Sequence, residues 1–214
     1  MSADIFVLVD DYQYTTNDAI NRTRIKSPGG AEWLTVPVLT KGLGRQRINE
    51  ININNMVQWK ERHMRTFAVN YCYAPYFEQF RDELFVVFER DWNQLVALNM
   101  TLIKFWARTL SIATPIVRSS DLLLSGKSNV RLYEMLEQMN CCTYLADTGF
   151  RSYLRHDEFE RNGFSLEFVN YEQLTENYHQ QFSAFVPGLS IVDLLFNEGL
   201  ASIKYLKTAG MRCV

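Results

Sequence analysis

The first pattern along the chain is an unbroken run of apolar residues close to its start. Ile5 to Val9 are all apolar, and Asp10 and Asp11 follow them at once. A short apolar run without alternation is typical of a strand buried on both faces of a parallel sheet. The two carboxylates would then lie at the carboxyl end of the strand, where open α/β sheets bind ligands. A strand that simply stops at polar residues would give the same pattern.

A period of two appears next, in residues 19–26. This period places Arg22, Arg24 and Lys26 on one face of a strand. The following Ser-Pro-Gly-Gly is a turn sequence, because Pro fixes φ and Gly accepts positive φ. We therefore expect residues 31–38 to fold back as an antiparallel partner. The row of cations can hold a phosphate or a carboxylate, or it can be the charged edge that protects a strand from aggregation.

Helical spacing begins with Trp59. Trp59, His63, Phe67 and Tyr71 recur every four residues, so all four lie on one stripe of a helix. A histidine on such a stripe is more often a hydrogen-bonded core residue than a catalyst. Lys60 lies beside the stripe, and His63 therefore stays a candidate for moving a proton at a site there.

Later segments add helices and short strands in alternation. Two apolar-faced helices come first, and the elements after them are a strand at 114–118, a helix at 130–139, a strand at 141–146, a helix at 147–162 and a strand at 164–169. Strand, helix, strand, helix, strand is the order of right-handed parallel crossovers. The predicted fold class is α/β, with a mostly parallel sheet, helices on both of its faces and an antiparallel hairpin excursion. At 214 residues, we expect one domain spanning 1–214.

Small polar residues follow the strands of this second half. Ser119 and Ser120 come after one strand, and Gly149 comes after another. Hydroxyls and free backbone N–H groups near a helix N-terminus are suited to an anion, although ordinary helix capping explains the same residues. Near the C-terminus, Ser190 and Asp193 match a capping box, in which each side chain bonds the other's backbone N–H. That motif needs no catalytic role for Asp193.

The composition excludes several classes of protein. A hydrophobic fraction of 47% and an aromatic fraction of 14% belong to a packed globular chain. The 22 basic and 24 acidic residues argue against nucleic acid as the main partner. No apolar run approaches the ~20 residues of a membrane helix, and the start lacks a signal-peptide profile, so we expect an intracellular protein without a membrane span. The 4 cysteines lack zinc spacing, and we expect reduced thiols and no metal site.

Motifs spread along the whole chain resemble the WbqC-like family. They are Asp10-Asp11-Tyr12-Gln13-Tyr14, Ile20-Asn21-Arg22 with Arg24-Ile25, Trp33 to Val38, Trp59-Lys60 with His63, Ala74 to Phe77, Gly149 with Tyr153-Leu154, and Phe185-Val186-Pro187 with Leu189 to Asn197. The match keeps the same order over nearly the full length. The resemblance implies a bacterial, cytoplasmic α/β protein, often associated with the biosynthesis of O-antigen and other surface polysaccharides. It leaves the reaction and any cofactor unspecified.

The chain also departs from that family. Family members typically begin with a further strand and helix that carry His-Gln-Pro, Tyr-Pro and Gly signatures, and this sequence has none of them. We therefore expect an internal start or a truncated variant, with an uncovered sheet edge that favours self-association. The missing opening resembles the start of nucleotidylyltransferase-like folds. This is an analogy of fold alone, and it implies a site over the first two strands.

Two hypotheses about function remain open. In the first, the protein is a transferase of sugar-nucleotide or amino-sugar metabolism that takes a small anionic ligand, with Asp11 or His63 handling a proton. The ligand-binding residues would be Asp10, Gln13, Asn21, Arg22, Arg24, Lys60, Ser119, Ser120, Gly149 and Tyr153. In the second, it is a non-catalytic binding or assembly protein of the same pathway, because no nucleophile–base pair or metal cluster can be assembled from the sequence.

One geometric expectation follows from the short loop between the first two strands. Asp11 and Gln13 follow the apolar run, and Arg22 and Arg24 leave the next turn on one face. Both groups should converge in one cleft. Residues 41–47 also combine glycines with cations, which suits a flexible loop that contacts an anion. As a phosphate motif they are weak, because they lack the Lys-Ser/Thr of a phosphate-binding loop and the dinucleotide fingerprint.

Overall fold

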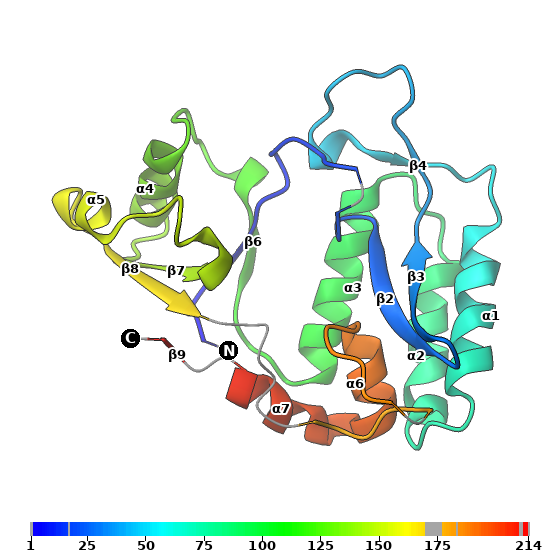
Figure 1. The fold of residues 1–214 in the computed structure, drawn as a ribbon. Coiled ribbons are helices and arrows are strands. Elements are labelled where there is room, and N and C mark those ends of the chain that lie inside the picture. The colour runs from blue at the N-terminus through cyan, green and yellow to red at the C-terminus, as the bar shows by residue number, and fades with distance from the viewer. Residues whose placement is uncertain (1, 17, 170–176, 183, 210–211, 214) are drawn as a thin grey trace. The chain divides into compact units, whose positions relative to one another are not determined.

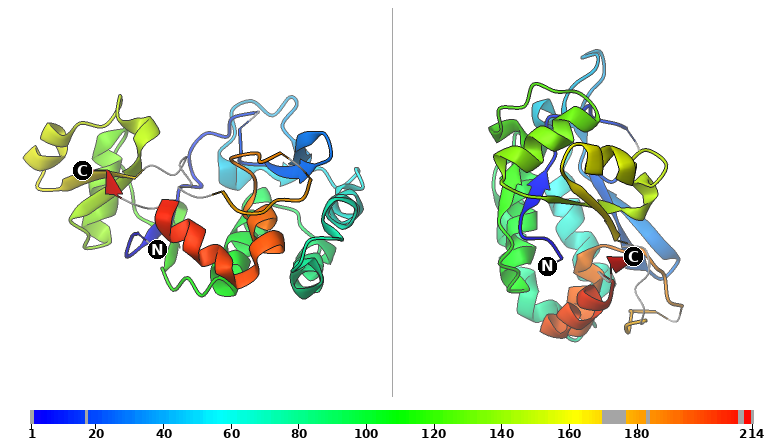
Figure 2. Two further views of the ribbon diagram at one scale, coloured as in Figure 1. Left: turned by 60° about the horizontal axis from the view of Figure 1, so that its bottom comes forward. Right: turned by 90° about the vertical axis from the view of Figure 1, so that its left-hand side faces the viewer.

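The computed structural model describes residues 2–16, 18–169, 177–182, 184–209 and 212–213. Its contacts divide the chain into two compact units. The first unit comprises Met1–Asp10, Ala113–Thr175 and Lys204–Val214, and the second comprises Asp11–Ile112 and Glu176–Ile203. Each unit is described below by itself (Figure 1, Figure 2). That the chain behaves as one domain stays a prediction.

The mixed α/β class is confirmed, since helices occur together with parallel and antiparallel strand pairs. In the first unit, β1 (Phe6–Leu8) pairs in parallel with β6 (Ile116–Arg118). Within the described residues the strands form several small sheets, and β1 has β6 as its partner in a two-stranded sheet. The burial expected for Ile5–Val9 on both faces is wrong, because Phe6 is 47% exposed and the other four residues of the run are only half-buried.

The other sheet of the first unit has the predicted crossover. Strands β7 (Thr143–Asp147) and β8 (Ser165–Val169) are parallel, and β9 (Arg212–Cys213) is antiparallel to β8. Helices α4 (Asn129–Gln138) and α5 (His156–Arg161) accompany this sheet. Their apolar sides meet in one core, formed by Leu136, Ala146, Leu154, Phe159, Leu166 and Phe168.

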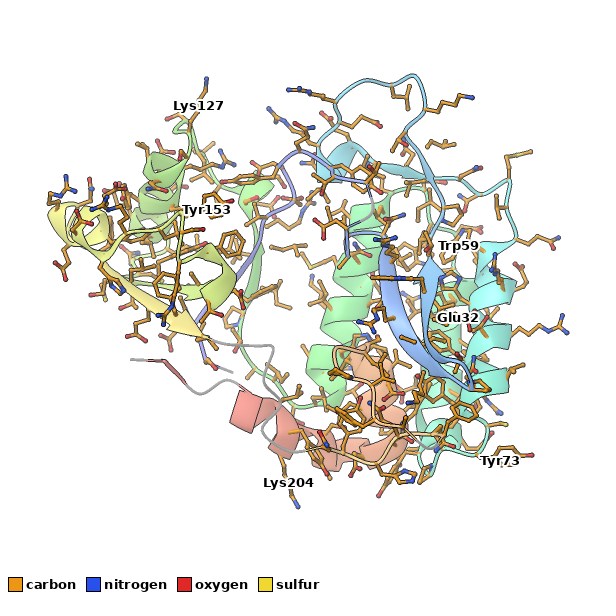
Figure 3. The ribbon with its side chains drawn as sticks, viewed as in Figure 1. Glu32, Trp59, Tyr73, Lys127, Tyr153 and Lys204 are labelled. Carbon is orange, nitrogen blue, oxygen red and sulfur yellow. The ribbon has the colours of Figure 1, made fainter. Side chains whose placement is uncertain are left out.

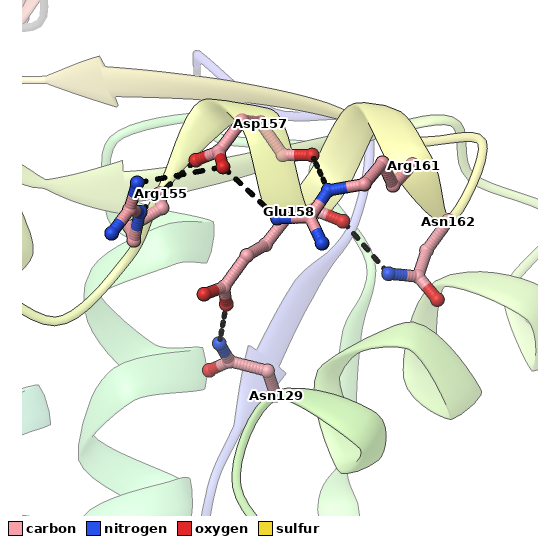
Figure 4. Close-up of polar contacts among 6 residues, drawn as sticks. All are labelled: Asn129, Arg155, Asp157, Glu158, Arg161 and Asn162. Atoms are coloured by element: carbon pink, nitrogen blue, oxygen red, sulfur yellow. Dashed lines mark hydrogen bonds and ion pairs between the residues drawn. The ribbon is translucent and has the colours of Figure 1, made fainter.

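Polar contacts on the surface fix α5 to the start of α4 (Figure 4). Asp157 accepts from Arg155 at 3.0 Å and from Arg161 at 2.9 Å, and Asn129 donates to Glu158 at 2.9 Å. The Asp157 side chain is 53% exposed in its ion pairs. Exposed ion pairs of this kind contribute about 0–1 kcal/mol each. The apolar core beneath them is therefore the main source of stability for this part of the unit.

The second unit contains the predicted hairpin. Strand β2 (Arg22–Ser27) pairs with β3 (Gly30–Thr35), and the register runs from Arg22 opposite Thr35 to Ser27 opposite Gly30. The tight turn between the strands is completed by Gly30, whose φ is +109°, a value that favours glycine. One face of the hairpin buries Ile25 and Leu34. The opposite face carries the basic row.

Helices supply most of the core of the second unit (Figure 1). The remaining elements of the chain are β4 (Val38–Leu39), η1 (Ile48–Glu50), β5 (Asn52–Ile53), α1 (Trp59–Tyr71), α2 (Phe77–Glu89), α3 (Leu95–Thr109), η2 (Ser119–Asp121), η3 (Thr148–Phe150), α6 (Ile191–Glu198), η4 (Gly199–Ala201) and α7 (Ser202–Ala209). β4 and β5 form a short antiparallel pair. Among the described residues, no helix has the length and apolar character needed to cross a membrane.

The aromatic stripe of α1 is buried, as the four-residue spacing predicts. Trp59, His63, Phe67 and Tyr71 are all at most 5% exposed. Phe88 of α2 packs on this stripe, and its ring centroid lies 6.1 Å from that of Trp59. The described cysteines are free thiols, namely Cys72, Cys141 and Cys142, and the side chain of Cys213 lies outside the described residues.

Candidate functional site

The carboxyl ends of β1 and β6 bring together residues that are far apart in sequence. Because the strands are parallel and Leu8 lies opposite Arg118, Asp10 reaches the segment that follows β6. Its Oδ2 lies 2.6 Å from Nη2 and 2.7 Å from Nε of Arg118. Two bonds from one guanidinium to one carboxylate fix both side chains. The predicted position of Asp10 at a strand end is confirmed, and its main partner is a cation of the protein itself.

The serines after β6 complete this Asp10 cluster, which comprises Asp10, Arg118, Ser119 and Ser120. The backbone N–H of Ser120 donates to Asp10 Oδ1 at 3.1 Å, and the Ser120 hydroxyl donates to Oδ2 at 2.9 Å. The N–H of Asp10 donates in return to Ser119 Oγ at 3.2 Å. The groups expected to hold an external anion therefore hold the Asp10 carboxylate, which is 1% exposed.

This environment decides the charge of Asp10. Burial on its own would raise the pKa of the carboxyl, but the bonds from Arg118 and from the N–H and hydroxyl of Ser120 outweigh it, and the pKa is lowered. A carboxylate held ionised in this way is a poor general base, because efficient bases have a pKa near the working pH. The Asp10 cluster is thus suited to positioning the strand ends.

The basic face of the β2–β3 hairpin has a different character. Arg22, Arg24 and Lys26 do lie on one face, opposite Thr35, Trp33 and Ala31 respectively in the ladder. The Arg22 guanidinium carbon is 4.1 Å from the centroid of the Trp33 ring, a cation–π contact. Trp33 is itself 47% exposed. Two of the three predicted cations therefore border an accessible aromatic ring.

Lys26 is separated from that accessible part of the row. It is 1% exposed, its ammonium donates to the carbonyl of Ala184, and its N–H donates to the Tyr71 hydroxyl at 2.9 Å. The segment from Ala184 to Ser190 is held to the same strand, because the Ser190 N–H donates to the carbonyl of Arg24 at 2.7 Å. This segment covers the Lys26 end of the hairpin.

A buried polar network that the sequence did not predict lies beside Lys26. The hydroxyl of Tyr71 donates to Asp193 Oδ1 at 2.8 Å, and that of Tyr178 donates to Oδ2 at 2.6 Å. The predicted capping box is therefore wrong in both of its bonds, although Ser190 is the N-cap of α6. Ser190 does accept from the N–H of Val192 at 3.4 Å, but both carboxylate oxygens of Asp193 bond tyrosines.

Electrostatics in this network favour protonated hydroxyls. Burial raises the pKa of Tyr71 and of Tyr178, and the nearby Asp193 carboxylate raises both further. Burial also raises the pKa of Asp193, although the two hydroxyls and the charge of Lys26 oppose the shift. Tyr71 and Tyr178 are therefore donors over the whole physiological range of pH. The Tyr71–Asp193–Tyr178 network ties α1 and the segment before α6 to α6.

His63 and Lys60 occupy separate surroundings on α1. His63 is 5% exposed, with Nδ1 2.6 Å from the carbonyl oxygen of Trp59. Burial lowers its pKa, the bond to Trp59 opposes this shift, and the charge of Arg62 adds to it. Lys60 pairs at 3.1 Å with the exposed Asp91. The surroundings of His63 are those of a neutral core histidine, and its catalytic role stays a prediction.

Other predicted residues have identifiable structural partners. Asn21 donates from its side chain to the carbonyl of Val36 at 2.9 Å and thereby closes the open end of the hairpin. Gln13 forms an isolated antiparallel bridge with Arg47, and Asp11 is half-buried. The convergence of Asp11 and Gln13 with the arginines of the hairpin in one cleft stays a prediction.

The Gly149 turn belongs to the first unit. The Gly149 N–H donates to Asp147 Oδ1 at 2.7 Å. A carboxylate of the chain therefore again occupies a predicted anion-binding site. Tyr153 follows it and is 75% exposed, with its side chain at the surface (Figure 3). In the part of the chain that the structure describes, no group of three His, Cys, Asp or Glu residues is arranged to hold a metal ion.

Comparison with known proteins places the chain in a family. The model of the WbqC-like protein family matches residues 1–205. The chain belongs to the WbqC-like protein family. A relative in this range is the "Uncharacterized protein Rv1507c" of Mycobacterium tuberculosis (strain ATCC 25618 / H37Rv), which is 33% identical over 205 residues. The alignment covers 95% of this WbqC-like chain and 88% of the relative. No solved structure gives a significant match.

Proposed function

We propose that this WbqC-like protein binds a small ligand that carries a phosphate or a carboxylate, through Arg22 and Arg24 on the β2–β3 hairpin. The ligand is a sugar nucleotide or an amino sugar bearing an anionic group. The protein would act on it as a transferase in the biosynthesis of bacterial surface polysaccharide such as O-antigen, or of amino sugars, in the cytoplasm. The observation that carries this proposal is the contact between Arg22 and the exposed Trp33 ring.

This contact favours an anion site over a merely charged strand. A solvated arginine loses much rotamer freedom when it grips a ligand, whereas a stacked guanidinium is already oriented. Glu32 does not neutralise the row, because it lies opposite Ile25 and so projects from the other face of the hairpin. Among the described residues, no carboxylate forms an ion pair with Arg24.

A role in binding without catalysis is the second candidate, and a specific observation favours it. Asp10 and Asp193 are both buried and each accepts hydrogen bonds on both carboxylate oxygens. His63 directs Nδ1 to a backbone carbonyl in the core. Of the two candidates for proton transfer in the transferase hypothesis, Asp11 and His63, these contacts therefore favour Asp11. In the binding reading, the same hairpin presents the ligand to another enzyme of the pathway.

A ligand screen tests both readings. Binding to the folded state raises thermal stability by RT ln(1 + [L]/Kd), so a panel of sugar nucleotides, sugar phosphates and uncharged sugars should give shifts only for its anionic members. Absence of any shift for an anionic member would overturn the proposal. For a compound that binds, ³¹P and ¹H NMR spectra recorded over hours distinguish turnover from simple binding. Loss of turnover in Asp11→Asn with unchanged affinity would support the transferase.

We also propose that the protein self-associates through the uncovered part of the β1–β6 sheet. Phe6 is 47% exposed on β1, and an exposed aromatic on a small sheet favours association. Light scattering after gel filtration should give a mass above that of one 25.0 kDa chain. Phe6→Glu should reduce that mass. A single-chain mass at all concentrations would contradict the proposal.

A further inference from the structure

We propose that Trp33 is the platform for the flat base of a nucleoside diphosphate, whose phosphates bind Arg24. This inference rests on the proposed function, because it uses the same face of the hairpin, and it selects the nucleotide from the ligands considered above. It also assigns a role to Trp33, which the sequence singled out only as part of a family resemblance.

The first step in the argument is the exposure of the Trp33 ring. Arg22 lies over the ring at 4.1 Å, and yet 47% of the residue remains accessible. An exposed indole costs hydration free energy, and aromatic rings recover it by stacking on another flat surface. Bases stack on aromatic side chains whatever their identity, because every base has a π face. We therefore place the base on the accessible part of Trp33.

The second step is the position of Arg24. It lies directly opposite Trp33 in the antiparallel ladder, where Cβ atoms are about 4.5–5.5 Å apart. The base and the phosphates of a nucleotide are separated by one ribose, so a single molecule can contact both side chains. A guanidinium can then bind phosphate oxygens with two parallel hydrogen bonds.

The third step concerns the space beside Arg24. Its Nη1 lies 3.9 Å from the place that a Cβ on Gly188 would occupy, and Gly188 has a φ of +66°. A side chain at Gly188 would be strained at this φ, and its Cβ would come into van der Waals contact with the guanidinium. Glycine at this position therefore places no side-chain atom against Arg24, which is half-buried.

Charge and shape separate the nucleotide from an amino sugar. An unmodified amino sugar is a cation near neutral pH, and Arg22 and Arg24 would repel it. A sugar 1-phosphate satisfies Arg24 but has no flat ring for Trp33. A nucleoside diphosphate carries both features. The chemistry of this face therefore favours a nucleotide-bearing ligand.

Isothermal titration of the wild-type protein gives the first test. The probes are ADP, GDP, UDP and dTDP, with inorganic pyrophosphate and glucose 1-phosphate for comparison. We expect at least one nucleoside diphosphate to bind about tenfold more tightly than pyrophosphate, since stacking of one base contributes roughly that factor or more. Equal affinity for pyrophosphate and every nucleotide would overturn the inference and would leave the proposed anion site standing. Absence of binding by all probes would overturn both.

Variants provide the second test. Trp33→Leu removes the stack on Arg22 as well, so it should lose about tenfold more affinity for the best nucleotide than for pyrophosphate, whereas Trp33→Phe should keep most of its affinity for both. Tyr73→Leu is the matched control, because Tyr73 is an aromatic residue of the same unit and is 90% exposed (Figure 3). Equal nucleotide affinities for Trp33→Leu and Tyr73→Leu would overturn the inference. Circular dichroism checks the fold, and Trp33→Phe keeps the test valid if Trp33→Leu does not fold.

Discussion

Arg22 stacks on Trp33 although the two residues are not opposite each other in the β2–β3 ladder. Arg22 pairs with Thr35 and Trp33 pairs with Arg24, so the stack runs along the diagonal of the hairpin face. Diagonal neighbours in a ladder are about 7–8 Å apart and meet only when both side chains are long. The diagonal contact leaves Arg24 beside the ring and gives this face two cations around one aromatic residue.

The hairpin arginines should matter more for ligand binding than the loop cations. Arg24→Ala should lose about 1.5–3 kcal/mol in binding an anionic hit from the ligand screen, if its charged hydrogen bonds are desolvated. Arg22→Ala should lose a similar amount, because it also removes the stack on Trp33. Arg45→Ala is the control, since Arg45 is exposed and should cost about 0–1 kcal/mol.

Isothermal titration of the wild-type protein and the three variants measures these losses. Equal losses at all three positions would mean diffuse attraction of an anion to a basic surface. No loss at either Arg22 or Arg24 would remove the hairpin from consideration as the site. Salt dependence separates the outcomes further, because exposed charges are screened more strongly than partly buried ones.

The Tyr71–Asp193–Tyr178 network should stabilise the second unit. Tyr71→Phe leaves one carboxylate oxygen of Asp193 and the N–H of Lys26 without the bonds that the hydroxyl makes. Tyr178→Phe leaves the other oxygen of Asp193 without its bond and also removes the hydroxyl that Gln180 bonds. An unmade hydrogen bond at a buried group costs about 1–3 kcal/mol, so both variants should lower the free energy of unfolding.

Denaturant unfolding of both variants and of the double variant checks this prediction. Because both hydroxyls bond one carboxylate, the losses should not add. Tyr153→Phe is the control, since Tyr153 is 75% exposed and loses no buried bond. An unfolding free energy of Tyr71→Phe that equals the wild-type value would contradict a stabilising role for the network.

How much of this architecture the sequence predicts depends on how far apart in sequence the contacting residues lie. The hairpin and the aromatic stripe follow from local rules, because the turn residues and the four-residue spacing lie within one segment, and both are confirmed. Asp10 bonds Ser119 and Ser120, which lie 109 and 110 positions away in the sequence. The parallel pairing of β1 and β6 brings these residues together. The pattern of apolar strands followed by polar residues locates both strand ends, but it does not show that these polar residues bond each other.

Two residues were missed for the same reason. Arg118 ends β6, and only the register with β1 shows that it pairs with Asp10. Asp193 was assigned to a capping box because Ser190 lies three residues before it, and Tyr71, its partner from α1, is 122 positions away. The available signal was a carboxylate inside the apolar run of α6, where residues 192 to 197 are all buried. A buried charge of this kind requires partners, and sequence does not name them.

Acid should weaken the Asp10 cluster. The folded pKa of Asp10 is lowered relative to an unfolded value of about 3.9. The folded state therefore binds fewer protons, and the contribution of Asp10 is present above the unfolded pKa and is lost as the pH falls through the folded pKa. At neutral pH, Asp10→Asn should cost about 1–3 kcal/mol because it weakens the charged bonds to Arg118. The difference from wild type should shrink as the pH falls below about 4.

Urea unfolding at several pH values measures this difference. Asp157→Asn is the matched control, because Asp157 also pairs with arginines but is 53% exposed in those pairs. It should lower the free energy of unfolding much less than Asp10→Asn at neutral pH, because exposed ion pairs contribute little. A difference between wild type and Asp10→Asn that stays constant down to pH 2 would contradict the lowered pKa of Asp10.

His63 should make the stability of the protein depend on pH between pH 5 and pH 7. Burial lowers its folded pKa below an unfolded value of about 6.5. The unfolded state then binds more protons, so the stability contributed by neutral His63 is present above pH 6.5 and is lost as the pH falls. His63→Phe places an apolar ring between Trp59 and Phe88, and it should remove this loss between pH 7 and pH 5. His156→Gln, which alters an exposed histidine, should keep the wild-type profile. If a substrate of the transferase is found, turnover by His63→Phe separates the core role from proton transfer. Activity near the wild-type level means that His63 serves the core. A loss of activity by two orders of magnitude or more, the usual size of a general acid–base contribution, assigns His63 to catalysis.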